Sequence, residues 1–339
     1  MSAKQKIFPV FVPHYGCPHQ CVFCDQKSIS GQFEPITPVS VQSKIEEMHA
    51  GIRGDEQIQL AFYGGSFTAI PETLQNALLE VTVPYIEDGT FSSIRVSTRP
   101  DAIDAKCLEK LKHYHVETIE LGAQSMDDEV LFLSGRGHSA ADVRNAASLI
   151  RAFGFELIIQ MMTGLPGDTI SRTRETAREI ASLHPDGVRI YPTVILRDTP
   201  LYEKWKAGVY HEHSVEEAIE FCSAIVPVFQ QEGIRIIRIG LNPSDDLSSG
   251  EAAGGAYHPA LGELVMNRIR YNEMAELLKS VPRGNEVTIC VPEALLSQYT
   301  GQHRINVRKL EDSFMLKSLR IRPAKDDAVT VYTGAFQKD

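Results

Sequence analysis

The 339-residue sequence predicts an α/β fold of repeated strand–helix units, followed by a smaller α+β extension. Short apolar runs with β-type periodicity alternate six times with longer helical stripes, which indicates βα units on a parallel sheet. A stretch rich in Gly, Ser and Asp at 242–255 ends this rhythm and is typical of an exposed loop. Six units suit either a doubly wound sheet or an incomplete barrel of the (β/α)₈ kind. We therefore expect a core domain over 1–240 and an extension over 241–339.

The predicted elements follow one another at intervals that leave room for one helix after each strand. The expected strands are 7–12, 58–63, 94–97, 116–121, 155–161 and 187–191. Thr37 and Pro38 form a cap and first-turn pair for the first helix. Further helices are expected after Pro71 and at 103–111, 143–150, 169–183 and 214–231, the last kinked or ended by Pro227. Past residue 240 we expect a helix over 262–279, a strand at 287–291, a short helix, and strands near 316–321 and 329–332.

The composition excludes several classes of protein. With 43% hydrophobic and 23% charged residues, the chain is not globally disordered. No apolar run reaches the roughly 18 residues of a membrane span, and the N-terminal residues do not resemble a signal peptide. We therefore expect a cytoplasmic protein. The formal charge of -10 argues against nucleic-acid binding over the whole surface, but it is compatible with a local basic patch.

Three of the six cysteines lie in one short loop directly after the first predicted strand. Cys17, Cys21 and Cys24 have the spacing C-x3-C-x2-C, which lets one loop place thiolates at three corners of an iron–sulfur cubane. Three ligands leave one iron open, as catalysis at a metal requires. The alternative is a zinc site that adds His14 or His19. The other cysteines fall on helix or strand stripes and are expected to be core thiols, namely Cys107, Cys222 and Cys290.

This cysteine spacing, with the aromatic Phe23 before the last Cys, resembles the cluster loop of the radical S-adenosylmethionine (SAM) superfamily. The resemblance implies an incomplete parallel (β/α)₆ barrel in which the three cysteines hold a [4Fe–4S] cluster. It implies further that the open iron chelates the amino and carboxylate groups of SAM. Electron transfer from a donor such as flavodoxin or ferredoxin then cleaves SAM to a 5′-deoxyadenosyl radical.

The residues at the other predicted strand ends agree with this resemblance. Paired glycines let a backbone approach a ligand closely, and an arginine can bind a carboxylate as a fork. The resemblance implies that seven residues at or near these strand ends contact SAM, namely Gly64, Gly65, Ser66, Ser97, Gln124, Arg136 and Gln160. Tyr191, at the end of the sixth strand, is the expected catalytic residue on the substrate side.

Within the superfamily, several stretches resemble the catalytic third subunit of the Elongator complex and its shorter bacterial relatives. They span about residues 7–240 and include the segments 64–68, 97–101, 120–125, 161–167 and 189–205. The cofactor contacts are also similar, more distantly, to those of oxygen-independent coproporphyrinogen oxidase. The hundred residues after 240 leave no room for the acetyltransferase domain of Elongator, so we do not expect its carboxymethylation chemistry. We expect hydrogen abstraction in tRNA base modification.

Two alternatives stay open at this point. One keeps the enzyme class but gives it a small metabolite or a tetrapyrrole-like substrate. The other is a zinc-stabilised binding protein without turnover. A basic segment favours RNA, because 301–325 carries seven Lys or Arg against Glu311 and Asp312, a local charge of +5. A solvated polar face would give the same pattern.

Overall fold

The computed structural model describes residues 6–12, 17, 19–25, 36–49, 57–242, 251–324 and 328–334. The chain divides into two compact units, Met1–Pro259 and Ala260–Asp339. The expected boundary at 240 lies inside the first unit, because β9 (Ala252–Gly255) pairs antiparallel with β7 (Val194–Leu196). Part of the expected loop at 242–255 is therefore a strand. Within the described ranges, every helix is too short or too polar to cross a bilayer.

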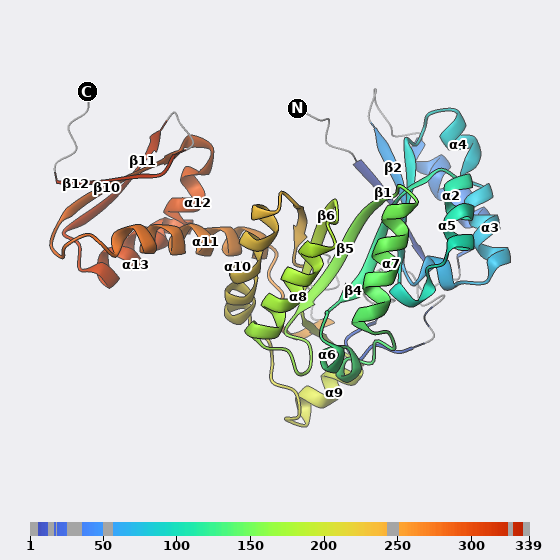
Figure 1. The fold of residues 1–339 in the computed structure, drawn as a ribbon, viewed down its shortest axis with the longest axis horizontal. Coiled ribbons are helices and arrows are strands. Elements are labelled where there is room, and N and C mark those ends of the chain that lie inside the picture. Colours follow the sequence, from blue (N-terminus) through green and yellow to red (C-terminus); the bar gives the residue numbers. More distant parts are fainter. Residues whose placement is uncertain are drawn as a thin grey trace. The chain divides into compact units, whose positions relative to one another are not determined.

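The first unit is built on a seven-stranded parallel sheet (Figure 1). Its strands are β1 (Lys6–Val12), β2 (Ile58–Gly64), β3 (Ser93–Thr98), β4 (Val116–Gln124), β5 (Glu156–Thr163), β6 (Gly187–Pro192) and β8 (Arg235–Ile239). They lie in the order β1-β2-β3-β4-β5-β6-β8, and each neighbouring pair is parallel. Strands in sequence order with helical crossovers curl into an open half-barrel. The incomplete parallel barrel is confirmed, with β8 added to the six predicted strands.

Helices connect these strands, and the longer ones cover the outer surface of the curled sheet (Figure 1). They are α2 (Pro38–His49), α3 (Glu72–Glu80), α4 (Val83–Glu87), α5 (Ala105–His113), α6 (Asp128–Leu133), α7 (Ala140–Ala152), α8 (Ile170–Ser182), α9 (Pro200–Lys206) and α10 (Val215–Gln231). The short 3₁₀ helices η1 (Phe67–Ala69) and η2 (Pro100–Ala102) follow β2 and β3. Side chains of Ser139 and Ser214 form capping boxes at the starts of α7 and α10. The helix α10 continues through Pro227.

The second unit packs helices against one three-stranded sheet. Its elements are α11 (Leu261–Leu278), β10 (Glu286–Pro292), η4 (Glu293–Leu295), α12 (Leu296–Thr300), η5 (Gln302–Arg304), α13 (Ile305–Phe314), β11 (Ser318–Ala324) and β12 (Thr330–Thr333). The strand order is β11-β10-β12, with β11 parallel and β12 antiparallel to β10. One core joins Met274 and Leu278 of α11 to Val287 and Ile289 of β10. The expected α+β extension is confirmed.

Candidate functional site

The loop after β1 brings the three expected cysteines within electrostatic reach of one another. Burial, together with the charges of Cys21 and Cys17, raises the pKa of the Cys24 thiol to about 12. Burial also raises the pKa of Cys17, although a hydrogen bond from the Ser66 backbone acts in the opposite direction. Cys17 therefore lies against the end of β2. Of the two zinc-ligand candidates, His19 is exposed, and His14 lies outside the described residues.

The chemistry of this donor set fits an iron–sulfur cluster. The buried Cys21 and the half-buried Cys17 and Cys24 lie close together, and the charges of Cys21 and Cys17 help to raise the pKa of Cys24, so ionising all three is unfavourable unless a cationic group balances their charge. Thiolates are the ligands that iron–sulfur clusters use. In the described ranges, no three His, Cys, Asp or Glu side chains are gathered closely enough to hold a single metal ion.

Arg136 joins the cysteine loop to the end of β4. Its Nη1 donates to the Cys21 Sγ at 3.2 Å, and its Nη2 donates to the Gly122 carbonyl oxygen at 2.7 Å. The side chain is buried, and its Nε has no hydrogen-bond partner among the described residues. The guanidinium of Arg99 donates one hydrogen bond to the Arg136 carbonyl and a pair of hydrogen bonds to the Asp101 carboxylate. One expected cofactor residue is thus fixed directly beside a cysteine.

The two glycines at the end of β2 bring that strand onto the base of the cysteine loop. Gly64 has a φ of +104°, and a Cβ there would lie 3.2 Å from the Val12 carbonyl oxygen. The next amide, of Gly65, donates to the same oxygen at 2.7 Å. The buried Ser66 Oγ lies 3.1 Å from the Thr98 Oγ1 and accepts from the Arg99 amide at 3.2 Å. Gly64 is therefore needed for the close approach of the ends of β1 and β2.

The remaining expected residues lie on β3, β4 and β5, with Ser97 and Gln124 near strand ends and Gln160 inside β5. Ser97 Oγ makes long contacts to the Phe62 and Gly65 carbonyl oxygens, at 3.3 and 3.4 Å. Gln160 Nε2 donates to the Gln124 Oε1 at 3.4 Å. Gln124 has a φ of +67° and follows a register shift in the β4–β5 pairing, which turns the strand end out of the regular ladder.

Sequence analysis missed Gly122, which occupies the space between two of these side chains. A Cβ on Gly122 would lie 3.1 Å from the Gln124 Nε2 and 3.5 Å from the Arg136 Nη2. A larger residue there would push apart the two groups that converge at this strand end. The sequence feature that could have indicated this role is a glycine inside a predicted strand, because such a glycine often marks the close approach of another group.

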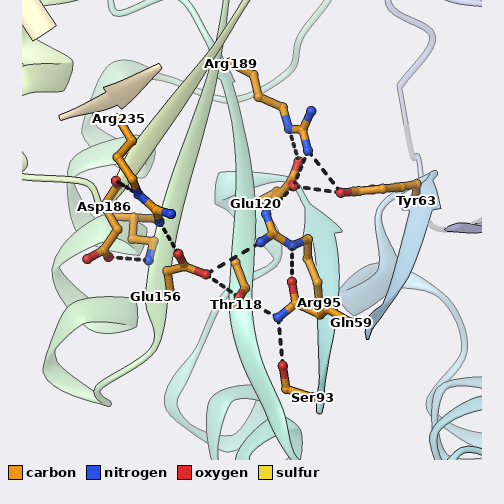
Figure 2. Close-up of polar contacts among 11 residues, drawn as sticks. Gln59, Tyr63, Ser93, Arg95, Thr118, Glu120, Glu156, Asp186, Arg189 and Arg235 are labelled. Carbon is orange, nitrogen blue, oxygen red and sulfur yellow. Dashed lines mark hydrogen bonds and ion pairs between the residues drawn. The ribbon is translucent and has the colours of Figure 1, made fainter. Parts of the chain in front are cut away.

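The structure also shows a buried ionic network inside the half-barrel, which sequence analysis did not predict (Figure 2). Glu120 of β4 pairs with Arg95 of β3 at 2.7 Å and with Arg189 of β6 at 3.0 Å. The Tyr63 hydroxyl donates to the same carboxylate at 2.9 Å. These residues occupy alternate strand positions that point into the barrel. Charged residues within otherwise apolar strands were the signal for this network.

A second polar layer lies nearer the amino ends of the strands (Figure 2). Gln59 accepts from Arg95 at 2.6 Å and donates to Ser93 and Thr118 at 2.9 and 3.0 Å. Thr118 donates to Glu156 at 2.5 Å. Two layers of hydrogen-bonded polar side chains thus occupy the interior of the half-barrel below the strand ends.

Tyr191 lies two residues beyond Arg189 on β6, toward the carboxyl end of the strand. Burial raises the pKa of its phenol, and the charge and hydrogen bond of Arg189 act in the opposite direction. The expected substrate-side residue is therefore next to the ionic network, on the same strand. The raised pKa keeps the phenol protonated near neutral pH.

The cysteine loop is held from two further sides. Val22 donates its amide to the Ser134 carbonyl at 3.0 Å and accepts from the Leu201 amide at 2.8 Å. Gly135 has a φ of +67°, and a Cβ there would lie 3.0 Å from the Gln20 carbonyl oxygen. A small apolar cluster joins Val22 to Ile195, Leu201 and Tyr210. The loop is thus packed between the end of α6 and the start of α9.

A separate cavity of about 310 Å³ lies beside the loop after β5. Its lining includes the segment 164–168 and the segment 209–213. His213 lies 3.1 Å from the Thr163 hydroxyl, and burial lowers the pKa of its imidazole to about 4. None of the expected cysteine or cofactor residues lines this cavity.

Comparisons with known families match most of the first unit. The family model described as Radical SAM superfamily matches residues 11–180. The model described as Radical_SAM C-terminal domain matches residues 185–271. The first range contains the cysteine loop and every strand end from β1 to β5.

Individual relatives match a similar share of the chain. The chain is 27% identical over 293 residues to the tRNA uridine(34) acetyltransferase of Methanocaldococcus infernus, covering 74% of this chain and 53% of that protein. It is 27% identical over 267 residues to Elongator complex protein 3 of Homo sapiens, covering 72% and 47%. The chain therefore spans about half the length of these relatives.

Solved structures show the same fold. The archaeal Methanocaldococcus infernus Elp3 with an N-terminal deletion matches with a TM-score of 0.64 and 24% sequence identity. The match covers 80% of this chain and 64% of that chain.

Proposed function

The chain belongs to the radical SAM superfamily, and from this premise we propose that Cys17, Cys21 and Cys24 hold a [4Fe–4S] cluster. Members of the superfamily are enzymes, and this chain is one of them. When bound together, the cluster and SAM supply a 5′-deoxyadenosyl radical for hydrogen abstraction from a substrate. The observation that carries the proposal is the position of Arg136, whose guanidinium bridges the Cys21 sulfur and the end of β4.

The chain's own residues bind and orient SAM at the strand ends. Arg136 keeps an Nε donor without a partner among the described residues, and this donor suits the SAM carboxylate. Gly64 lets the end of β2 pack against the Val12 backbone just before the cysteine loop, so Gly64, Gly65 and Ser66 are held beside the proposed cluster, where they would contact the amino group. The amides of Gln124 and Gln160 suit the ribose hydroxyls. The full proposed set is Gly64, Gly65, Ser66, Ser97, Gln124, Arg136 and Gln160.

The buried ionic network occupies the barrel interior beneath this site and limits the solvent that can reach it from below. Glu120 accepts from the Tyr63 hydroxyl and from both arginines, and it thereby fixes the two guanidinium groups. Tyr191 presents a protonated phenol beside Arg189, and it can donate a hydrogen bond to a substrate carbonyl. Tyr191→Phe should therefore slow substrate modification while uncoupled release of 5′-deoxyadenosine persists. Equal loss of both products would show that Tyr191 serves SAM cleavage instead.

We propose that the substrate is a tRNA base. Support comes from the relative named tRNA uridine(34) acetyltransferase and from the basic segment 301–325. Of that segment's basic residues, five are exposed, namely Arg304, Arg308, Lys309, Lys317 and Arg320, whereas Lys325 lies outside the described residues. The proposed partners are tRNA and a one-electron donor of the flavodoxin or ferredoxin kind.

Anaerobic reconstitution tests the cluster. The reconstituted chain should bind about four irons, and addition of SAM should alter the electron paramagnetic resonance spectrum of the dithionite-reduced protein. Cys107→Ser is the matched control, because Cys107 lies on α5 outside the loop. A colourless protein that takes up zinc alone would contradict the proposal.

Nucleoside mass spectrometry of tRNA from a deletion strain tests the substrate. One modified nucleoside should disappear from the deletion strain and return when the gene is restored. The nucleoside should not return when the restored gene encodes the Cys24→Ser variant. An unchanged nucleoside profile in the deletion strain would exclude tRNA and favour a small-metabolite substrate.

A further inference from the structure

Arg99 is a buried arginine beside the cysteine loop, and the proposed binding of SAM gives it no role. It lies between β3 and η2 and is 4% exposed. Its amide donates to the Ser66 Oγ at 3.2 Å, and the Ser66 backbone makes a hydrogen bond to Cys17. Burial raises the pKa of the Cys17 thiol, and the charges of Arg99 and Arg136 act in the opposite direction. Both guanidinium groups are therefore within electrostatic reach of the cysteine loop.

The Arg99 guanidinium is held on two sides. Its Nη2 donates to the Arg136 carbonyl oxygen, so it fixes the backbone of the arginine that contacts the Cys21 sulfur. Its Nε and Nη2 donate to the Asp101 carboxylate at 2.9 and 3.1 Å. Its Nη1 is buried and has no hydrogen-bond partner among the residues that the structure describes. The Asp101 side chain is 27% exposed, against 5% for Arg99, so this ion pair has a buried cation and a partly hydrated anion.

Reduction of a [4Fe–4S] cluster adds one negative charge at the cysteine loop. The electron comes from the one-electron donor, which is oxidised in the same step, and no bond forms or breaks. A buried cation nearby stabilises the added charge, because the protein interior screens it weakly. A partly exposed carboxylate opposes the added charge less, because water and salt screen it. Charge and hydrogen bonds around the cysteine ligands thus set the reduction potential of such a cluster.

We propose that Arg99 is a positioning residue that favours the reduced state of the cluster, both through its charge and by holding Arg136 at the cysteine loop. The ion pair with Asp101 fixes the guanidinium in its buried position. This inference rests on the proposed function, because it needs the cluster at the three loop cysteines. A merely structural role, in which the ion pair only stabilises the turn after β3, makes a different prediction for the two partners.

A redox titration of the reconstituted full chain, followed by the electron paramagnetic resonance signal of the reduced cluster, tests the proposal. Arg99→Gln removes the buried charge, so the ratio of reduced to oxidised cluster at a fixed potential should fall about tenfold. For a one-electron couple this is a midpoint potential about 59 mV lower. Arg99→Lys keeps the charge and should stay closer to the wild type than Arg99→Gln. Arg144→Gln is the control, because it removes an exposed arginine that pairs with Glu179, and it should leave the midpoint potential unchanged.

Asp101→Asn separates the electrostatic role from the structural one. This variant breaks the same ion pair as Arg99→Gln, but it removes the negative partner and leaves the cation beside the loop. The proposal therefore predicts a midpoint potential above that of the wild type. A structural role predicts that both variants move the midpoint potential in the same direction, or leave it unchanged. Asp101→Asn alone decides between the two roles if Arg99→Gln does not fold.

Three results would overturn the proposal. The first is a midpoint potential of Asp101→Asn at or below that of the wild type. The second is a midpoint potential of Arg99→Gln equal to that of the wild type. The third is an equal shift in Arg99→Lys and Arg99→Gln, which would assign the effect to hydrogen-bond geometry and not to charge. Each of these results, in a wild-type chain that binds about four irons and releases 5′-deoxyadenosine, leaves the proposed function standing. A wild-type chain that takes up no cluster would contradict the proposed function, and this inference with it.

Discussion

Arg136 donates a hydrogen bond to the sulfur of Cys21 at 3.2 Å, although the two residues are 115 positions apart in the chain. The same guanidinium holds the Gly122 carbonyl oxygen at the end of β4. The cysteine loop and the barrel mouth are thus linked through one side chain. The position of this cation beside a thiol is the reason to treat Arg136 as part of the site and not as a surface residue.

Arg136→Lys should slow release of 5′-deoxyadenosine at least about tenfold. Lysine keeps the charge, but it has no planar fork to contact a sulfur and a carbonyl oxygen together. The measurement is the rate of 5′-deoxyadenosine formation at saturating dithionite, with the iron content determined on the same sample. Arg144→Lys is the control, because Arg144 pairs with Glu179 on the protein surface. A wild-type rate in Arg136→Lys would contradict the proposed role.

Gly135→Ala should reduce iron uptake by the cysteine loop. The new Cβ would lie 3.0 Å from the Gln20 carbonyl oxygen, so the backbone just before Cys21 has to move. Gly89→Ala is the matched control, because Gly89 also has a positive φ, of +80°, but no atom lies within 4 Å of the added Cβ. Both variants carry backbone strain. Iron per chain after reconstitution should fall only for Gly135→Ala, and equal iron contents would show that the loop tolerates the shift.

Glu120→Gln should lower the free energy of unfolding by about 3–5 kcal/mol. The change removes the carboxylate that pairs with Arg189 and leaves Arg95 only its longer contact to Glu156 at 3.6 Å, and a buried charge that loses its partner is costly. Urea unfolding of the apo-protein gives this value. Glu179→Gln removes an exposed partner of Arg144 and should cost less than about 1 kcal/mol. Similar losses for the two variants would mean that the network contributes no more than a surface pair.

Acid should destabilise the fold through His213. Burial lowers the pKa of this imidazole to about 4, whereas an unfolded histidine titrates near about 6.5. Between these values only the unfolded chain binds the proton, so stability is complete above about pH 6.5 and falls as the pH drops toward 4. The slope approaches about 1.4 kcal/mol per pH unit for one such group.

His213→Asn should flatten that dependence, because asparagine does not titrate. The comparison uses urea unfolding of both proteins at several pH values between about 6.5 and 5. The expected result is a shallower dependence of the free energy of unfolding on pH in the variant. Some dependence should remain, because burial and Arg136 also lower the pKa of His138 to about 4. Parallel slopes in the two proteins would show that His213 becomes protonated in the folded state.

Much of the fold followed from the sequence because its strands are short apolar runs separated by amphipathic helices. The six strands from β1 to β6 appear where periodicity placed them. β8 was missed because its two arginines interrupt the apolar pattern. β9 was missed because Ala252–Gly255 has the composition of a loop, and only its pairing with β7 makes it a strand. Pairing between distant segments is not encoded in local periodicity.

Sequence motifs predicted the individual site residues, but they did not predict the contacts between those residues. The sequence shows Cys21 and Arg136 as separate signals, and their contact depends on how α6 returns the chain to the cysteine loop. Likewise, Glu120 and Arg189 are isolated charges in apolar strands until the sheet curls and brings them to one interior layer. Side-chain contacts across a curled sheet depend on register and curvature, which local sequence does not specify.

We propose that the cysteine loop supports reductive cleavage of SAM. The most direct test is the amount of 5′-deoxyadenosine released per chain from SAM and dithionite under anaerobic conditions. We predict release by the wild type and by Cys107→Ser, and none by Cys17→Ser, Cys21→Ser or Cys24→Ser. Release that persists in Cys24→Ser, or is absent from a wild-type chain reconstituted with iron and sulfide, would contradict the claim.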